Sequence, residues 1–177
     1  DSSVPQDPRV GWPELQWSQS MPKVELRQDR WCVQCAVRGK WVLLEPEEWV
    51  RQNLIQTLCG LGWPLSRMVL EHPVRFGQVD GRVDVACFDR LGRVALAVEV
   101  KAPNVPLNQK VADQVARYDL ALGCPWLMIS NGLKLLFGSG IHRGLAGHTE
   151  VGRNRLGPRK APLLNKVDVM WESRGKP

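Results

Sequence analysis

The sequence predicts an α/β domain, and two observations carry this prediction. Apolar residues recur at helical spacing in two segments of the 177-residue chain. Short apolar runs bounded by Gly, Pro and Asp turns, which are typical of strands, stand between these segments and after the second one. The predicted order is αβββαβ with one further strand at the end. A chain of this length favours one domain with a substantial core.

An N-terminal extension, residues 1–29, precedes this pattern and is predicted to be partly irregular. It contains Pro and Trp residues but no basic start followed by an apolar segment, so no signal peptide is expected. From Trp31 to Leu44, apolar residues alternate irregularly around an Arg38-Gly39-Lys40 turn. This pattern predicts a β-hairpin that leads into the core.

Two helices are predicted from their start signals, their spacing and their stops. The first begins at Glu45-Pro46-Glu47-Glu48, where Pro stands early and the carboxylates complement the helix dipole, and it ends at Gly60. The second runs from Asn108 to Leu122 and ends at Gly123. Apolar residues repeat along one face of each helix: Val50, Leu54, Leu58 and Leu61 in the first, and Val111, Val115, Tyr118 and Leu122 in the second.

Five strands are predicted around these helices. Three follow the first helix, and the turn Asp89-Arg90-Leu91-Gly92 joins the second of them to the third. Two follow the second helix, and Asn131-Gly132 between them is a strong hairpin signal. The predicted strands are Arg67 to Val74, Arg82 to Phe88, Val94 to Lys101, Pro125 to Ile129 and Leu133 to Phe137.

The composition and charge of the chain narrow the cellular compartment and the binding partners that are expected for it. A net charge of +6 and a pI near 9.3 are compatible with a polyanionic partner. Five cysteines form an odd set without the density of a disulfide scaffold, which favours a reducing cytoplasm. The longest apolar runs are far shorter than the roughly 20 residues of a membrane span, so no membrane partner is expected. The basic, Gly-rich tail, residues 138–177, is either a solvated end or a segment that binds a nucleic-acid backbone.

The strands present three candidate site residues, Asp84, Glu99 and Lys101. Glu99 and Lys101 stand at i and i+2, so they share one face of their strand. A two- or four-residue turn before this strand pairs Ala97 with Asp84, which places Asp84 diagonal to Glu99 on that face. The small residues Ala95 and Ala97 are expected on the same face, and Val94, Leu96, Val98 and Val100 form an apolar row on the other, which is expected to pack on a helix.

Two converging carboxylates repel each other and raise each other's pKa unless a cation lies between them. Mg²⁺ takes one or two carboxylates and fills its octahedron with water and phosphate oxygens, so such a pair suits phosphodiester hydrolysis. Lys101 then polarises the attacking water or neutralises charge on the phosphate. The alternative is a surface strand on which Glu99 and Lys101 form an exposed ion pair of little energetic value.

A second group of polar residues lies on the helices. Gln114 and Tyr118 stand at i and i+4, so they share the face of Val111 and Val115, where a polar Gln needs a partner. Five motifs follow one another along the chain: Glu47-Glu48-Trp49-Val50-Arg51-Gln52, Arg82-x-Asp84, Glu99-x-Lys101-Ala102-Pro103, Gln114-x-x-x-Tyr118 and Ser130-Asn131-Gly132. In this order and spacing they resemble the N-terminal nuclease domain of type I restriction enzyme R subunits, which belongs to the PD-(D/E)XK nuclease superfamily.

This resemblance implies a restriction-endonuclease-like core, a mixed sheet flanked by helices, over residues 30–137. It also implies a metal-dependent endonuclease that cuts DNA with Mg²⁺, for which Mn²⁺ is a substitute. Its implied metal ligands are Asp84, Glu99 and the Val100 carbonyl, with Glu48 touching the metal through water. Glu47 is the alternative to Glu48. Lys101 is the implied catalytic lysine, and Gln114 with Tyr118 positions the site or the DNA.

The sequence leaves two functions open. The chain has no G-x-x-x-x-G-K-[ST] loop, so it is not expected to move along DNA by ATP hydrolysis itself. DNA is the expected partner, together with a second copy of the chain or a protein that supplies motor or specificity functions. The alternative to a nuclease is a catalytically silent module of the same fold that binds nucleic acid or regulates.

Overall fold

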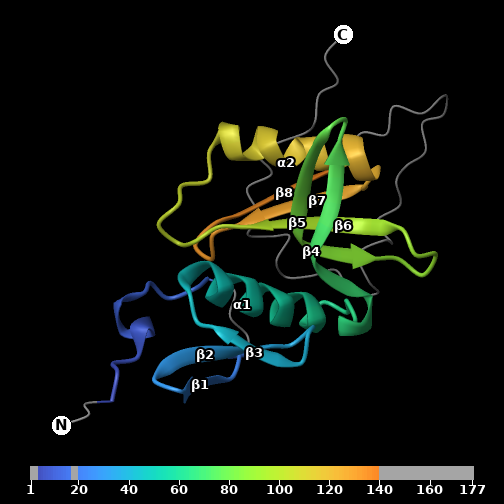
Figure 1. Cartoon of the computed structure of the whole chain (residues 1–177). Helices are drawn as coiled ribbons and strands as arrows, with labels where there is room; N and C mark the ends of the chain where they lie inside the picture. The colour runs from blue at the N-terminus through green and yellow to red at the C-terminus, as the bar shows by residue number, and fades with distance from the viewer. Residues whose placement is uncertain (1–3, 17–19, 140–177) are drawn as a thin grey trace, which may run out of the picture.

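The computed structural model describes residues 4–16 and 20–139 of the chain. The predicted tail, residues 138–177, lies outside the described residues apart from its first two positions. Within these ranges the α/β prediction is confirmed, because two helices cover the two faces of a five-stranded mixed sheet (Figure 1). Each core element that the sequence predicts is present.

The five-stranded sheet runs in the order β4-β5-β6-β7-β8. All neighbouring strands are antiparallel except β6 and β7, which are parallel. A parallel pair needs a long crossover, and the second helix supplies it. The strands are β4 (Met68–Phe76), β5 (Val79–Phe88), β6 (Val94–Val100), β7 (Trp126–Ser130) and β8 (Leu135–Ser139).

Helices α1 (Pro46–Gly60) and α2 (Gln109–Leu122) pack on opposite faces of this sheet. Ile55 and Leu58 of α1 join the core cluster that includes Val98 of β6. Val115 of α2 joins a second cluster with Ala97 on the other face. No helix in the described ranges has the length and apolarity needed to cross a membrane.

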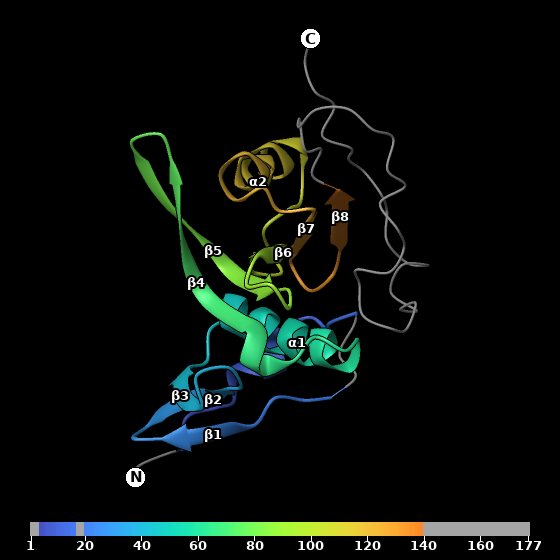
Figure 2. The ribbon, with the colours of Figure 1, turned by 90° about the vertical axis from the view of Figure 1, so that its right-hand side faces the viewer.

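A second, three-stranded sheet covers the side of α1 that faces away from the large sheet (Figure 2). Its strands β2 and β3 are the predicted hairpin, whereas β1 was not predicted. Val33, Leu44 and Trp49 form the apolar cluster that joins this sheet to α1. The remaining elements are β1 (Val24–Arg27), β2 (Arg30–Cys35), β3 (Lys40–Leu43) and the short 3-10 helices η1 (Pro8–Gly11) and η2 (Leu65–Arg67).

The predicted register between β5 and β6 is wrong by two residues. Ala97 pairs with Ala86 and not with Asp84. A shift of two keeps every side chain on its face because strand side chains alternate with a period of two. Continued by one residue beyond its last pair, this register brings Asp84 directly opposite Glu99, where the sequence predicted a diagonal.

A β-bulge accounts for one residue of this shift and reverses two further predictions, and the turn between the strands accounts for the other residue. Cys87 pairs with Leu96, but the next residue of β5, Phe88, pairs with Val94, so Ala95 has no partner in the ladder. Ala95 therefore packs in the cluster on the α1 side, and Val94 packs in the cluster on the α2 side. The sequence pattern predicted the opposite faces for both, because a uniform alternation has no place for an extra residue.

Candidate active site

An open cleft with a volume of about 510 Å³ is lined by residues of α1, the β4–β5 hairpin, β6 and α2. Five of its lining side chains are carboxylates, although the chain has a net charge of +6. The residues that bring charged or polar groups to the cleft are Glu47, Arg51, Glu71, Asp80, Arg82, Asp84, Glu99, Gln114, Arg117 and Tyr118.

Asp84 lies where the β5–β6 ladder opens. The last paired residues are Val85 and Val98, and beyond them the Asp84 carboxylate inserts and its Oδ2 accepts the Val100 N–H at 2.7 Å. In an extended strand the N–H and C=O of one residue point to the same side. The Val100 carbonyl therefore faces β5 as well, next to the carboxylate of Asp84.

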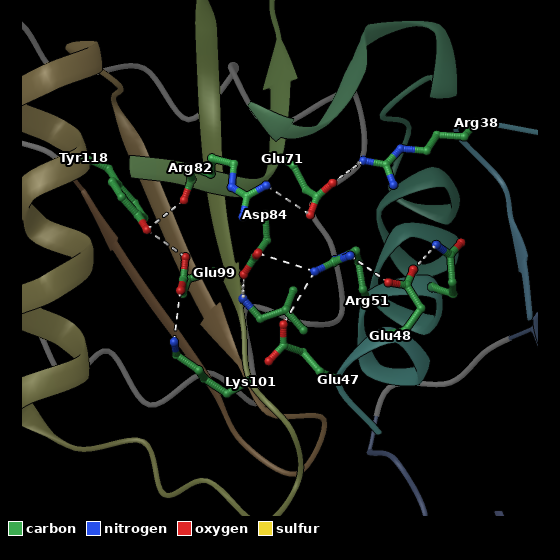
Figure 3. Close-up of polar contacts among 12 residues, drawn as sticks. Arg38, Glu47, Glu48, Arg51, Glu71, Arg82, Asp84, Glu99, Lys101 and Tyr118 are labelled. Atoms are coloured by element: carbon green, nitrogen blue, oxygen red, sulfur yellow. Dashed lines mark hydrogen bonds and ion pairs between the residues drawn. The ribbon is translucent and has the colours of Figure 1, made fainter. Parts of the chain in front are cut away.

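Glu99 is the most buried carboxylate of the cleft, with only 6% of its surface exposed. Its Oε1 accepts a hydrogen bond from Lys101 Nζ at 3.0 Å, and its Oε2 accepts one from Tyr118 Oη at 2.9 Å. Burial raises the pKa of Glu99, and the charge of Asp84 raises it further. Asp84, Glu99 and Lys101 thus converge, as Figure 3 shows.

Tyr118 connects α2 to this site. Its Oη lies 2.9 Å from Glu99 Oε2 and 3.0 Å from the Arg82 carbonyl oxygen. Burial raises the pKa of Tyr118, and the charge of Glu99 adds to the effect. The ring stacks on Phe76 with 5.7 Å between centroids, and a Cβ on Gly81 would lie 3.0 Å from Phe76. The β4–β5 hairpin and α2 are thereby packed together beside Glu99.

The first turn of α1 presents Glu47, and not Glu48, to the cleft. Glu48 Oε2 accepts from Arg51 Nη1 at 2.6 Å, and its Oε1 accepts from Gln52 Nε2 at 2.8 Å, so both oxygens are directed along the helix. Burial raises the pKa of Glu47, and the charge of Asp84 adds to the effect. Successive helical residues point about 100° apart, which is why two adjacent acids have different neighbours.

Gln114 lies on the exposed side of α2 and lines the cleft. The sequence predicted that Gln114 lies at the apolar edge of the helix and needs a hydrogen-bond partner there. The structure instead leaves its amide at the cleft surface, where it faces solvent. Arg117 is exposed on the same part of α2 and also lines the cleft.

Arg51 is a site residue that the sequence analysis did not assign. Only 7% of its surface is exposed, and its Nη2 lies 3.5 Å from both Glu47 Oε1 and Asp84 Oδ1. Its Nε is buried and has no hydrogen-bond partner among the described residues. A Glu and an Arg at i and i+4 usually mark an exposed helix face, so the spacing alone gave no signal for a buried role.

Glu71 is a second site residue that the sequence did not predict, and its backbone conformation is unusual. Its φ of +52° places it in the left-handed region, and the β4–β5 ladder has no pair at this position. Arg38 Nη2 donates to Glu71 Oε2 at 2.6 Å, and Arg82 Nη1 lies 3.8 Å from Glu71 Oε1. The Arg38 guanidinium lowers the pKa of Glu71. Through Arg38, the three-stranded sheet reaches the rim of the cleft.

The oxygen donors of the cleft can be matched to Mg²⁺, the ion that the resemblance implies. Within the described ranges, no three His, Cys, Asp or Glu side chains converge as a metal-binding group. Asp84 and Glu99 offer two carboxylates, and the Val100 carbonyl, which points toward β5, is a third candidate oxygen. This set does not fit an ion that needs an all-protein cage, but it fits Mg²⁺, which usually binds one or two carboxylates and keeps several waters.

Fold and site together define an α/β domain with an acidic cleft at one end of a mixed sheet, in which two carboxylates and a lysine converge. The model of the family described as "Type I restriction enzyme R protein N terminus" matches residues 46–140. This range covers more than half of the 177 residues, and the chain belongs to this family. Searches among curated proteins and among solved structures find no match.

Proposed function

We propose that this protein is a Mg²⁺-dependent deoxyribonuclease that hydrolyses phosphodiester bonds in DNA. The observation that carries the proposal is the buried Glu99, which lies beside Asp84 and accepts a hydrogen bond from Lys101 at 3.0 Å. A carboxylate with a raised pKa at the wall of a cleft is costly for a folded protein and is typical of functional sites. Membership of a restriction-enzyme family supports the same reaction.

In this proposal Asp84, Glu99 and the Val100 carbonyl hold the metal, and Mn²⁺ can replace Mg²⁺. When bound, the ion supplies a Lewis acid for the attack of water on phosphorus. Lys101 stabilises the negative charge that develops on the phosphate. Tyr118 holds Glu99 in place. Glu47, which lines the cleft, takes the role that the sequence gave to Glu48, an outer contact to the metal through water.

DNA is the proposed substrate, and other subunits are proposed partners. The positive net charge favours a polyanion, and the exposed side chains of Gln114 and Arg117 line the same cleft as the carboxylates, where they are available to contact DNA. Because restriction enzymes combine cleavage with translocation and sequence recognition, we propose that partner proteins supply these functions. We also propose that the fold is a restriction-endonuclease-like core, as the sequence resemblance implies.

Cleavage assays on plasmid and single-stranded DNA test this function. We expect the wild-type protein to cut with Mg²⁺ or Mn²⁺ and to be inactive with EDTA. Glu99→Gln and Lys101→Met should each lose at least about 100-fold in rate, because each removes charge at the reacting centre. The matched controls Glu25→Gln and Lys110→Met change exposed residues away from these contacts and should keep the wild-type rate.

Two outcomes would contradict the proposal. Cleavage that persists in Glu99→Gln and Lys101→Met would show that another site, or a contaminant, performs the reaction. Binding of DNA by the wild-type protein without cleavage under any metal condition would instead identify a silent module of the same fold.

A further inference from the structure

Arg51 is a buried cation of the site that takes no part in the proposed reaction. Its guanidinium extends from α1 toward the sheet and lies between Glu48 and Asp84 (Figure 3). Lysine and arginine are rarely buried without a specific charge partner. Arg51 has three acidic neighbours at 2.6 to 3.5 Å, so its charge is directed at these carboxylates and not at solvent. The neighbours are Glu47, Glu48 and Asp84.

A chain of hydrogen bonds fixes Arg51 from the side opposite the cleft. Arg51 Nη1 donates to Glu48, Gln52 Nε2 donates to the same carboxylate at 2.8 Å, and Gln52 Oε1 accepts the Ala36 N–H at 3.1 Å. The side chain of Gln52 is fully buried. Ala36 follows β2 and lies outside residues 46–140, the range that the family model matches. The three-stranded sheet therefore helps to hold the Arg51 guanidinium in the cleft.

The ion pairs of Arg51 and Lys101 join six side chains, and the charges of these six do not balance without a further cation. Four carboxylates face two fixed cations, which leaves an excess of two negative charges when every group is ionised. One divalent ion would neutralise this excess. The carboxylates are Glu47, Glu48, Asp84 and Glu99, and the cations are Arg51 and Lys101.

We propose that Arg51 is the internal counter-cation of the metal site: it holds Asp84 and Glu47 in place in the metal-free protein and weakens divalent-ion binding by its charge. This inference rests on the proposed function, because it assumes that the cluster binds a metal. Arg51 is a positioning residue, since it acts through the carboxylates. Its consequence is a site that is ordered before the metal binds and that releases the metal readily.

Metal binding by the full chain, without DNA, tests this inference. The free Mn²⁺ signal in electron paramagnetic resonance gives the affinity, and thermal unfolding with and without Mn²⁺ gives the metal-induced gain in Tm. We expect Arg51→Gln to bind Mn²⁺ about tenfold more tightly than the wild type, because a unit charge a few ångströms from a divalent ion has at least this effect. Its metal-induced gain in Tm should also be larger.

Two variants complete the comparison. Arg93→Gln is the matched control, since Arg93 pairs with Asp89 at i and i+4 but lies on the distant turn, and it should keep the wild-type affinity. Arg51→Lys should bind Mn²⁺ more tightly than the wild type but less tightly than Arg51→Gln, because an ammonium cannot bridge Glu48 and Asp84 as the planar guanidinium does. If Arg51→Gln does not fold, Arg51→Lys decides the test.

The results separate three cases. Tighter binding in both Arg51 variants supports the inference. Unchanged or weaker binding, with the same loss of Tm in the presence and absence of Mn²⁺, would overturn it and leave Arg51 a purely structural residue. A wild-type protein that binds no Mn²⁺ would refute the proposed function and this inference together.

Discussion

Tyr118→Phe is the substitution that isolates one contact of the site. It removes only the Oη, which lies 2.9 Å from Glu99 Oε2 and 3.0 Å from the Arg82 carbonyl oxygen. The ring stays, so its stacking on Phe76 is retained. After the change, Lys101 is the one remaining side-chain donor to Glu99 in the described contacts.

The magnitude follows from the type of bond that is lost. A hydrogen bond to a charged group contributes about 1.5 to 3 kcal/mol, and its buried acceptor is left unsatisfied when the donor is removed. We therefore expect the free energy of unfolding to fall by about 1.5 to 3 kcal/mol. If the same bond holds Glu99 for metal binding, the cleavage rate should fall about 10- to 100-fold, since about 1.4 kcal/mol corresponds to a factor of ten.

Urea unfolding at pH 7 and single-turnover cleavage of a DNA duplex measure the two effects of Tyr118→Phe. A change in unfolding free energy below about 0.5 kcal/mol would be within the range of ordinary surface substitutions. Such a result, combined with an unchanged cleavage rate, would refute the reasoning that Tyr118 orients Glu99.

Three further predictions concern single residues. Tyr118 is the only tyrosine in the chain, so an alkaline difference spectrum reports on it alone, and its midpoint should lie above the ordinary value of 10.0 because burial disfavours the tyrosinate. Arg38→Gln should lower the unfolding free energy by at most about 1 kcal/mol at pH 7, as measured by urea unfolding. Because Arg38 lowers the pKa of Glu71, this pair stabilises above the ordinary pKa of 4.5, and the difference should vanish as pH falls through the lowered value. Gly132→Ala should cost about 1 to 3 kcal/mol in thermal unfolding, since φ is +84° and the new Cβ would lie 2.6 Å from Leu15.

Each of these predictions has a contrary result. A tyrosine that titrates at its ordinary value would show that Tyr118 is exposed to water and not bonded to Glu99. An effect of Arg38→Gln that is the same at acidic and neutral pH would exclude the ion pair with Glu71 as its cause. An unchanged Tm in Gly132→Ala would mean that the N-terminal segment around Leu15 does not pack on this turn.

The elements of the core follow from local sequence signals. Pro46 with the acids behind it marks the start of α1, and Asn131-Gly132 marks the turn between β7 and β8. The face of the sheet on which Glu99 lies also follows from the sequence, because the alternation of side chains between the two faces of a strand is a local property. Asp84 and Glu99 therefore lie on one face of the sheet, as the spacing predicts, although their exact register differs from the prediction.

The features that sequence reasoning missed depend on contacts between distant segments. The bulge that leaves Ala95 unpaired arises from how two strands meet, and neither strand carries a mark of it. Arg51 acquires its role from Asp84, which lies 33 residues away in the chain. Glu47 and Glu48 both satisfy the dipole preference of a first helical turn, so only the position of the helix on the sheet distinguishes them.

The proposed metal site is tested most directly by an anomalous difference map from a crystal of the protein soaked in Mn²⁺. We expect a peak in the cleft, within about 2.0 to 2.4 Å of carboxylate oxygens of both Asp84 and Glu99, which is the range for direct ligation by oxygen. The Val100 carbonyl should face the same peak. A map with no peak in the cleft, or with one that touches neither carboxylate, at a Mn²⁺ concentration that supports cleavage would rule out this metal site.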